Sequence, residues 1–219
     1  MHTPTPSSRT STNRRQHAAA VVQAPTAARI RRRAQRTIHF LTQDELRRLF
    51  KAMRSKRDRA IFLVAYRHGL RASEIGLLQR ADVDMQQGRI AIHRLKGSLS
   101  GMYPMQPDVM KVIRSYLRTR TDASPYLFVS NRRVPIGRFM LLHLMQTYGA
   151  LAGIPEEKQK FHCLKHSIAT HLLDAGADLA FVKDWLGHAN IQNTTIYARL
   201  TTATRDAQAR TIFASHRVV

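Results

Sequence analysis

The 219-residue sequence contains one cysteine, Cys163, and no long hydrophobic run. A single thiol excludes an intramolecular disulfide and a cysteine-based metal site, and it fits a reducing compartment. No apolar stretch approaches the ~20 residues needed to span a bilayer. The five apolar residues from Ala18 to Val22 are also too few for the ~7–15-residue core of a signal peptide. We therefore expect a cytoplasmic protein without a membrane partner.

Acidic residues are scarce as well: 14 Asp and Glu stand against 36 Lys and Arg, so the formal net charge is +22. This excess makes a polyanion the expected partner. Residues 1–36 contain no carboxylate and carry eight arginines, including Arg31, Arg32 and Arg33. Such a segment cannot build a core, so we expect a disordered basic arm. It is either a DNA-binding arm that contacts phosphates or a solubilising tail or translated leader.

The pattern beyond the arm predicts one mostly helical α+β domain over residues 37–219 with a small antiparallel sheet. Thr42 to Glu45 form a capping box that opens a helix. Further helices are expected at about 57–68, 72–79, 107–119, 136–151, 162–175, 178–187 and 193–200. Ile90, Ile92 and Arg94 alternate with polar residues, as in a half-buried strand, and a turn at 96–101 leads to a returning strand at 102–105.

Four segments carry residue types that handle protons or phosphate. In the first, Arg71 follows the helix-breaking Gly69 and precedes Glu74 by one turn. This arrangement suits a surface ion pair or an oriented phosphate clamp. In the second, Lys96 lies in the predicted hairpin, where lysine usually protects a sheet edge.

The third segment contains three histidines and Lys165 within ten residues. With i, i+3 spacing, His162 and Lys165 are expected to share one helix face. The segment is either a polar helix face or a site of proton transfer, and metal binding is less favoured because no carboxylate accompanies the histidines. In the fourth segment, His188 follows Gly187 and Tyr197 lies on a short helix, where a tyrosine is most often a core or interface residue.

Taken in order, these segments resemble the tyrosine recombinase (phage integrase) family. The motifs are Gly-Leu-Arg71-x-x-Glu74, a strand lysine at 96, His162-x-x-Lys165, Leu-Gly-His188 and Thr-x-x-Tyr197 nine residues later. The resemblance covers about residues 38–200. Because few residues precede this region, the sequence resembles the short members that consist of the catalytic domain, such as the recombinases that invert fimbrial promoter elements.

The resemblance implies a site-specific recombinase that cleaves and rejoins double-stranded DNA through a covalent 3′-phosphotyrosine, without a metal or other cofactor. It also implies a tetramer on two recombination sites. Six residues would be catalytic: Arg71, Lys96, His162, Lys165, His188 and Tyr197.

The family's roles carry over to these positions. Tyr197 would be the nucleophile, and Lys96 would protonate the leaving 5′-oxygen. His162 would act as general base or bind the phosphate. Arg71, Lys165 and His188 would bind its oxygens, and Glu74 would orient Arg71.

Two features depart from the family pattern. Lys165 replaces the family's second arginine, which keeps the charge but loses the planar fork that binds two oxygens. Only about 36 residues precede the domain, where longer members have a helical core-binding domain. Two alternatives stay open: a catalytically weak DNA-binding relic or accessory factor, and an enzyme like type IB topoisomerases. Residues 201–219 either dock on a neighbouring protomer, fray, or pack against their own subunit.

Overall fold

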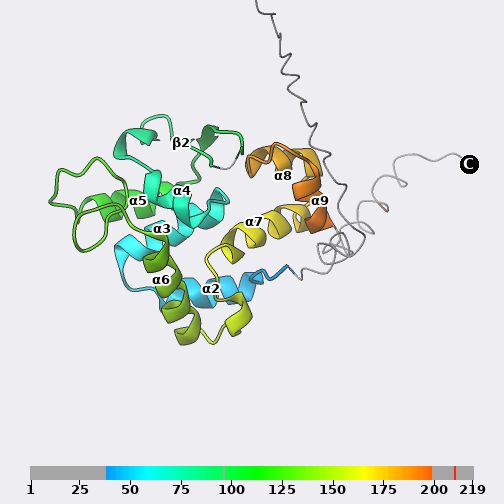
Figure 1. Cartoon of the computed structure of the whole chain (residues 1–219), viewed down its shortest axis with the longest axis horizontal. Helices are drawn as coiled ribbons and strands as arrows, with labels where there is room; N and C mark the ends of the chain where they lie inside the picture. Colours follow the sequence, from blue (N-terminus) through cyan, green and yellow to red (C-terminus); the bar gives the residue numbers. More distant parts are fainter. Residues whose placement is uncertain (1–37, 96, 199–209, 211–219) are drawn as a thin grey trace, which may run out of the picture. The chain divides into compact units, whose positions relative to one another are not determined.

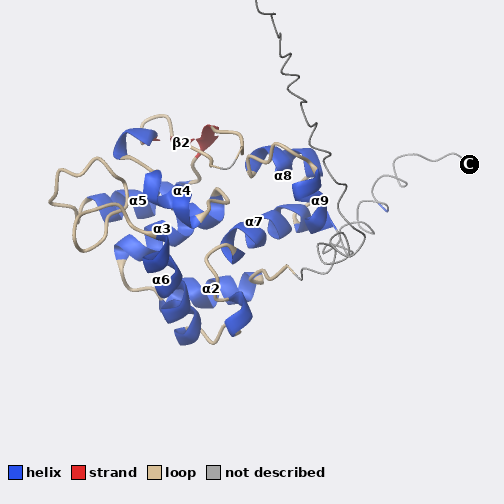
Figure 2. Cartoon of the chain, in the orientation of Figure 1, coloured by secondary structure: helices blue, strands red, loops and turns tan. Residues whose placement is uncertain are grey.

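The computed structural model describes residues 38–95, 97–198 and 210 (Figure 1). The predictions for the basic arm with Arg31, Arg32 and Arg33, for Lys96 and for the C-terminal tail lie outside the described residues. The described part of the chain is mostly helical with one small antiparallel sheet (Figure 2), which confirms the predicted fold class. The assignment of 37–219 to one domain stays a prediction.

The first helices are α2 (Gln43–Ala52), α3 (Lys56–Arg67) and α4 (Ala72–Leu77). The capping box is present, because Glu45 N donates to Thr42 Oγ1 (3.2 Å) and Thr42 N donates to Glu45 Oε2 (2.7 Å). Gly69 adopts a φ of 58° just beyond α3, and a Cβ at this position would lie 2.4 Å from a methyl group of Leu186. Glycine therefore ends the helix and also permits the close approach of a distant segment.

The sheet has the strand order β1-β2-β3, with β1 (Val83–Asp84), β2 (Arg89–Ile92) and β3 (Gly101–Pro104). Ile90 of β2 pairs with Tyr103 of β3. The two-residue strand β1 was not predicted, since it is too short to show alternation. Arg94 is also not part of the strand, which ends two residues earlier, although its side chain is fully buried.

Five more helices follow in the described part of the chain: α5 (Pro107–Leu117), α6 (Arg138–Leu151), α7 (Cys163–Asp174), α8 (Leu179–Trp185) and α9 (Gln192–Ala198). Two 3₁₀ turns, η1 (Arg80–Asp82) and η2 (Glu156–Lys158), connect other elements. The predicted helices are confirmed, and their described ends differ from the predicted ends by at most two residues. No helix among the described residues is long and apolar enough to cross a membrane.

Helix α3 lies at the centre of the domain and packs against α5 and α7 (Figure 1). Its Phe62 ring meets Phe161, just before α7, edge to face at 5.4 Å. Helices α7, α8 and α9 pack against one another, so that the last two segments of the candidate site share one corner of the fold.

Candidate active site

The candidate site begins at the turn between α3 and α4. Glu74 is almost fully buried (1% exposed), whereas the Arg71 side chain is 30% exposed. The carboxylate accepts hydrogen bonds from the Arg71 backbone N (2.8 Å) and from Arg71 Nη1 (2.7 Å), and Nη1 also donates to Ser98 Oγ (3.2 Å). Burial by itself would raise the pKa of Glu74, but its bonds to Arg71 outweigh this effect and hold the pKa below its usual value. Glu74 is therefore a buried anion that fixes a half-exposed guanidinium.

Lys165 on α7 is a buried cation next to this pair. Its side chain is only 5% exposed, and Nζ donates to the backbone oxygen of Leu186 at the end of α8 (3.0 Å). Burial, together with repulsion from Arg94 and Arg71, lowers the pKa of Lys165 to about 7. The positive charge of Lys165 is thus present only below or near neutral pH.

His188 follows α8 after a turn at Gly187, which has a φ of 66°. The imidazole is buried, and its Nδ1 lies 2.9 Å from Thr194 Oγ1 on α9. Burial and the charges of Lys165 and Arg71 lower the pKa of His188 to about 3. His188 is therefore neutral at physiological pH, and Thr194 ties it to the helix that carries Tyr197.

Tyr197 lies on α9 with its ring buried (2% exposed) and its hydroxyl 2.8 Å from His166 Nδ1 on α7. Burial raises the pKa of Tyr197, and the charge of Arg71 opposes the rise only in part. Burial, with repulsion from His162 and Lys165, lowers the pKa of His166 to about 4. The pair is therefore a protonated phenol beside a neutral imidazole, which can accept its proton.

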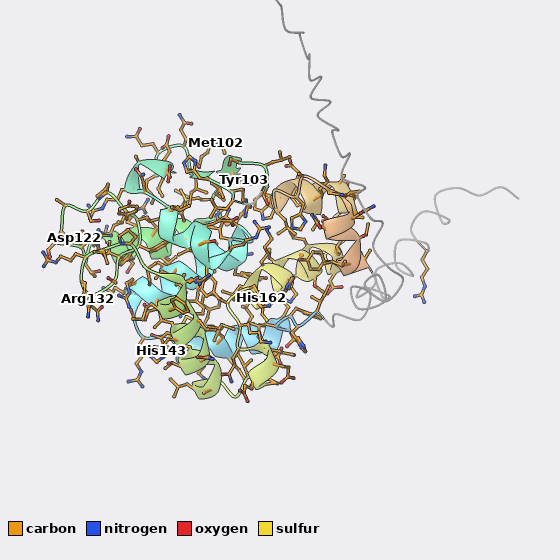
Figure 3. The ribbon with its side chains drawn as sticks, in the orientation of Figure 1. Met102, Tyr103, Asp122, Arg132, His143 and His162 are labelled. Carbon is orange, nitrogen blue, oxygen red and sulfur yellow. The ribbon has the colours of Figure 1, made fainter. Side chains whose placement is uncertain are left out.

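The structure separates His162 from Lys165, which the sequence placed on one face. His162, labelled in Figure 3, lies at the start of α7 and is exposed, whereas Lys165 is buried. The His162 ring contacts the ring of His166, with 5.3 Å between centroids. Side chains four residues apart on a helix point in more similar directions than side chains three apart. This favours contact of His162 with His166 over contact with Lys165.

The structure brings four of the predicted site residues together from four parts of the chain. The charge of Arg71 affects the pKa of each of the other three, Lys165, His188 and Tyr197. Lys96 lies outside the described residues, and the ring of His162 contacts His166, the residue that meets Tyr197. The sequence did not identify two participants. One is Arg94, and the other is His166 as the direct partner of Tyr197. For His166, the one signal in the sequence was its position next to Lys165 in a histidine-rich segment.

Other features of the described residues do not compete with this site. A pocket of about 950 cubic ångströms lies between α2, α3 and α5, and none of the candidate residues lines it. Among the described residues, no group of three His, Cys, Asp or Glu side chains is arranged to hold a metal ion. The candidate active site is therefore the region where the buried cations and Tyr197 meet.

Comparison with known proteins adds an independent line of evidence. Residues 39–204 match the Phage integrase family. The chain is 37% identical over 166 residues to "Tyrosine recombinase XerA" of Thermococcus onnurineus, covering 74% of this chain and 58% of the relative. It is 34% identical over 167 residues to "Type 1 fimbriae regulatory protein FimB" of Escherichia coli K12, covering 73% of this chain and 83% of the relative. The chain thus spans little more than half of the archaeal protein but most of the fimbrial one.

Solved structures agree in fold. The crystal structure of XerA recombinase superposes with a TM-score of 0.68 at 33% identity, covering 82% of this chain and 65% of that chain. The XerH site-specific recombinase, crystallised bound to its palindromic difH substrate, superposes with a TM-score of 0.66 at 22% identity, covering 79% of this chain and 53% of that chain.

Proposed function

Because the chain belongs to the phage integrase family of tyrosine recombinases, we propose that it is a site-specific DNA recombinase that breaks and rejoins double-stranded DNA. Tyr197 forms the covalent 3′-phosphotyrosine intermediate. The observation that carries this proposal is the hydrogen bond between Tyr197 and the neutral His166, beside the cations Arg71 and Lys165. A buried phenol needs both a proton acceptor and nearby positive charge before it can attack a phosphodiester.

In the proposed cleavage step, the Tyr197 oxygen attacks phosphorus and its proton passes to His166 Nδ1. His162, in contact with the His166 ring, supports this transfer or binds the phosphate. Arg71, Lys165 and His188 stabilise the nonbridging oxygens as negative charge develops on them. The 5′-oxygen leaves with a proton, for which we propose Lys96.

Rejoining is the reverse reaction, with a 5′-hydroxyl as the nucleophile. The phosphotyrosine bond retains the energy of the broken phosphodiester, so the reaction requires neither a cofactor nor ATP. Double-stranded DNA is the proposed partner, with a tetramer of the chain on two sites. We propose the arm with Arg31, Arg32 and Arg33 as a contact to DNA phosphates, which would make binding salt-dependent, and the cytoplasm as the location.

One observation favours a second candidate, a DNA-binding protein with weak cleavage. The ammonium of Lys165 is buried and donates to the Leu186 backbone oxygen. An arginine in its place would present a fork of donors to phosphate, whereas this lysine offers a single point charge. The loss of one such bidentate contact reduces a rate by roughly a hundredfold.

A nicked-duplex library tests the proposal without knowledge of the target sequence. Each duplex carries a random central segment and a nick, so that cleavage releases a short oligonucleotide and traps the protein. SDS-resistant adducts are purified and sequenced. We expect adducts enriched in one site flanked by inverted repeats, and none with Tyr197→Phe.

Tyr148→Phe is the matched control, because Tyr148 is a half-buried tyrosine whose hydroxyl donates to Asp58 (2.7 Å) far from the site. This variant should still form the adduct. Tight duplex binding without any adduct would favour the second candidate, and relaxation of any supercoiled plasmid would favour a topoisomerase-like enzyme.

A further inference from the structure

Arg94 is a buried arginine that the proposed reaction does not use. Its side chain is fully buried, and it lies between the end of α3 and the end of α8. Nη2 donates to the backbone oxygens of His68 (2.8 Å) and Trp185 (2.9 Å). Nη1 donates to Gly69 O (3.0 Å) and lies 3.4 Å from Glu74 Oε2. One guanidinium thus joins the α3–α4 turn, the carboxylate that orients Arg71, and the last turn of α8.

The end of α8 receives unusual support from side chains. Three consecutive carbonyl oxygens accept hydrogen bonds from three separate segments: Asp184 O from Tyr103 (3.4 Å), Trp185 O from Arg94 (2.9 Å) and Leu186 O from Lys165 (3.0 Å). Carbonyls in the last turn of a helix have no partner within the helix, and the helix dipole places negative charge there. Two buried cations therefore fix the end of α8 from two sides.

Tyr103 completes this arrangement. It is labelled in Figure 3 and points from β3 toward α8. The Arg94 guanidinium lies over its ring, 5.5 Å from the centroid, and the ring meets Trp185 edge to face at 5.6 Å. Such packing restricts the guanidinium to one orientation, so its donors are aimed in advance.

The turn that leads to His188 fits directly against Arg94. A Cβ at Gly187 would lie 3.0 Å from Arg94 Nε and 2.6 Å from Leu99 O. The backbone N of Leu99 in turn donates to Gly187 O (2.8 Å). The turn before His188 is therefore held by Arg94 on one side and by the β2–β3 hairpin on the other.

We propose that Arg94 is a positioning residue for DNA cleavage, which holds the Arg71–Glu74 pair and the turn carrying His188 in one fixed arrangement around the phosphate. This inference rests on the proposed function. We assign Arg94 to positioning because both of its Nη atoms already donate to backbone oxygens and its side chain has no exposed surface. A lysine at this position would keep the charge but would lack the fork that reaches carbonyls on both sides.

The test separates positioning from a general contribution to stability. Arg120 is the matched control: it is nearly buried (5% exposed), pairs with Asp122 and lies over the ring of Tyr116 at 5.7 Å. It therefore resembles Arg94 in chemistry but belongs to another part of the fold. Arg94→Met, Arg94→Lys and Arg120→Met are compared with the wild type, using the site recovered from the nicked-duplex library.

For each variant, circular dichroism gives the folded fraction, and duplex affinity and single-turnover adduct formation are measured separately. We expect adduct formation per folded molecule to fall by about 10²-fold in Arg94→Met, because small displacements of reacting groups reduce rates by about this factor. Duplex affinity should be unchanged. Arg94→Lys should lose less, and Arg120→Met should cleave at the wild-type rate. In Arg94→Ala, added guanidinium ion should restore part of the rate. Cleavage at the wild-type rate by Arg94→Met, or by Arg94→Lys if the methionine variant does not fold, would overturn the inference.

A second measurement needs no DNA. The ring signals of His188 in the NMR spectrum should move in Arg94→Lys and stay in place in Arg120→Met. Unchanged His188 signals would overturn the inference even if the wild type cleaves DNA. A different outcome is a wild type that forms no adduct while the His188 signals still move in Arg94→Lys. That result would refute the proposed function and the role of Arg94 in cleavage, but it would support the arrangement of Arg94 and His188.

Discussion

Cleavage by this protein should be lost as the pH rises through neutrality, because Lys165 loses its charge there. The ammonium is buried beside Arg94 and Arg71, and its pKa is lowered to about 7. If the charged form is needed at the phosphate, about one molecule in ten is competent at pH 8 and about one in a hundred at pH 9. The rate of adduct formation at low DNA concentration, which reports the free protein, should fall by the same factors.

The acidic side of the profile has a different cause. His166 must be neutral to accept the proton of Tyr197, and its pKa is lowered to about 4. The rate should therefore rise between about pH 3 and pH 5 and reach a plateau between the pKa values of His166 and Lys165. Bound phosphate favours the charged lysine, so saturating DNA should shift the basic side to higher pH.

The stability of the DNA-free protein should change in the opposite direction. The pKa of Lys165 is lower in the folded protein than its usual value of 10.5, so the folded state binds fewer protons than the unfolded state above pH 7. The contribution of Lys165 to the free energy of unfolding therefore increases from pH 7 toward 10.5, and this gain is lost as the pH falls through about 7. Urea unfolding at pH 6 and pH 8.5 measures the difference.

Lys165→Arg tests whether the loss of cleavage above neutral pH comes from Lys165, because arginine stays charged between pH 6 and pH 9. The variant should preserve cleavage at pH 6 and exceed the wild type by about tenfold or more at pH 8.5. Lys111→Arg, an exposed lysine on α5, is the control and should keep the wild-type profile. A basic limb that persists in Lys165→Arg, or a large loss of cleavage at pH 6, would refute the assignment.

Three further substitutions test other parts of the site. His166→Gln should lower the rate of adduct formation by about 10²–10³-fold without weakening duplex binding, whereas His171→Gln on the same helix should not; an equal rate in His166→Gln would exclude it as the proton acceptor. Glu74→Gln leaves Arg71 and Arg94 without their carboxylate and should lower the free energy of unfolding in urea by about 3 kcal/mol; an unchanged midpoint would contradict the buried ion pair. Gly187→Ala should destabilise the protein more than Gly176→Ala, because both glycines have positive φ but only Gly187 would bring a Cβ within 2.6 Å of a backbone oxygen; equal melting temperatures would contradict the tight turn.

Local signals predicted most of the fold. The capping box at Thr42 and the positive φ of Gly69 depend on interactions within a few residues, which the sequence displays directly. The burial of Ile61 and Phe62 follows from helical spacing alone. Helix ends differ by a few residues because side-chain caps and tertiary contacts decide where a helix frays.

The missing parts of the site depend on contacts between distant segments. The partners of Arg94 come from His68, Gly69 and Trp185, which no spacing along the chain connects with it. The rotation of α7 about its axis decides that His166 meets the hydroxyl of Tyr197. The burial of Lys165 results from the approach of α8, so its lowered pKa is a property of the folded structure.

Identification of the residue bound to DNA tests the central claim most directly. Adducts recovered from the nicked-duplex library are digested with nuclease and trypsin and analysed by mass spectrometry. Trypsin releases residues 184–199, in which Tyr197 is the one tyrosine. The account predicts this peptide with a nucleotide linked through its 3′-phosphate to Tyr197. An adduct on another residue, or only unmodified peptide from a preparation that binds the duplex, would contradict it.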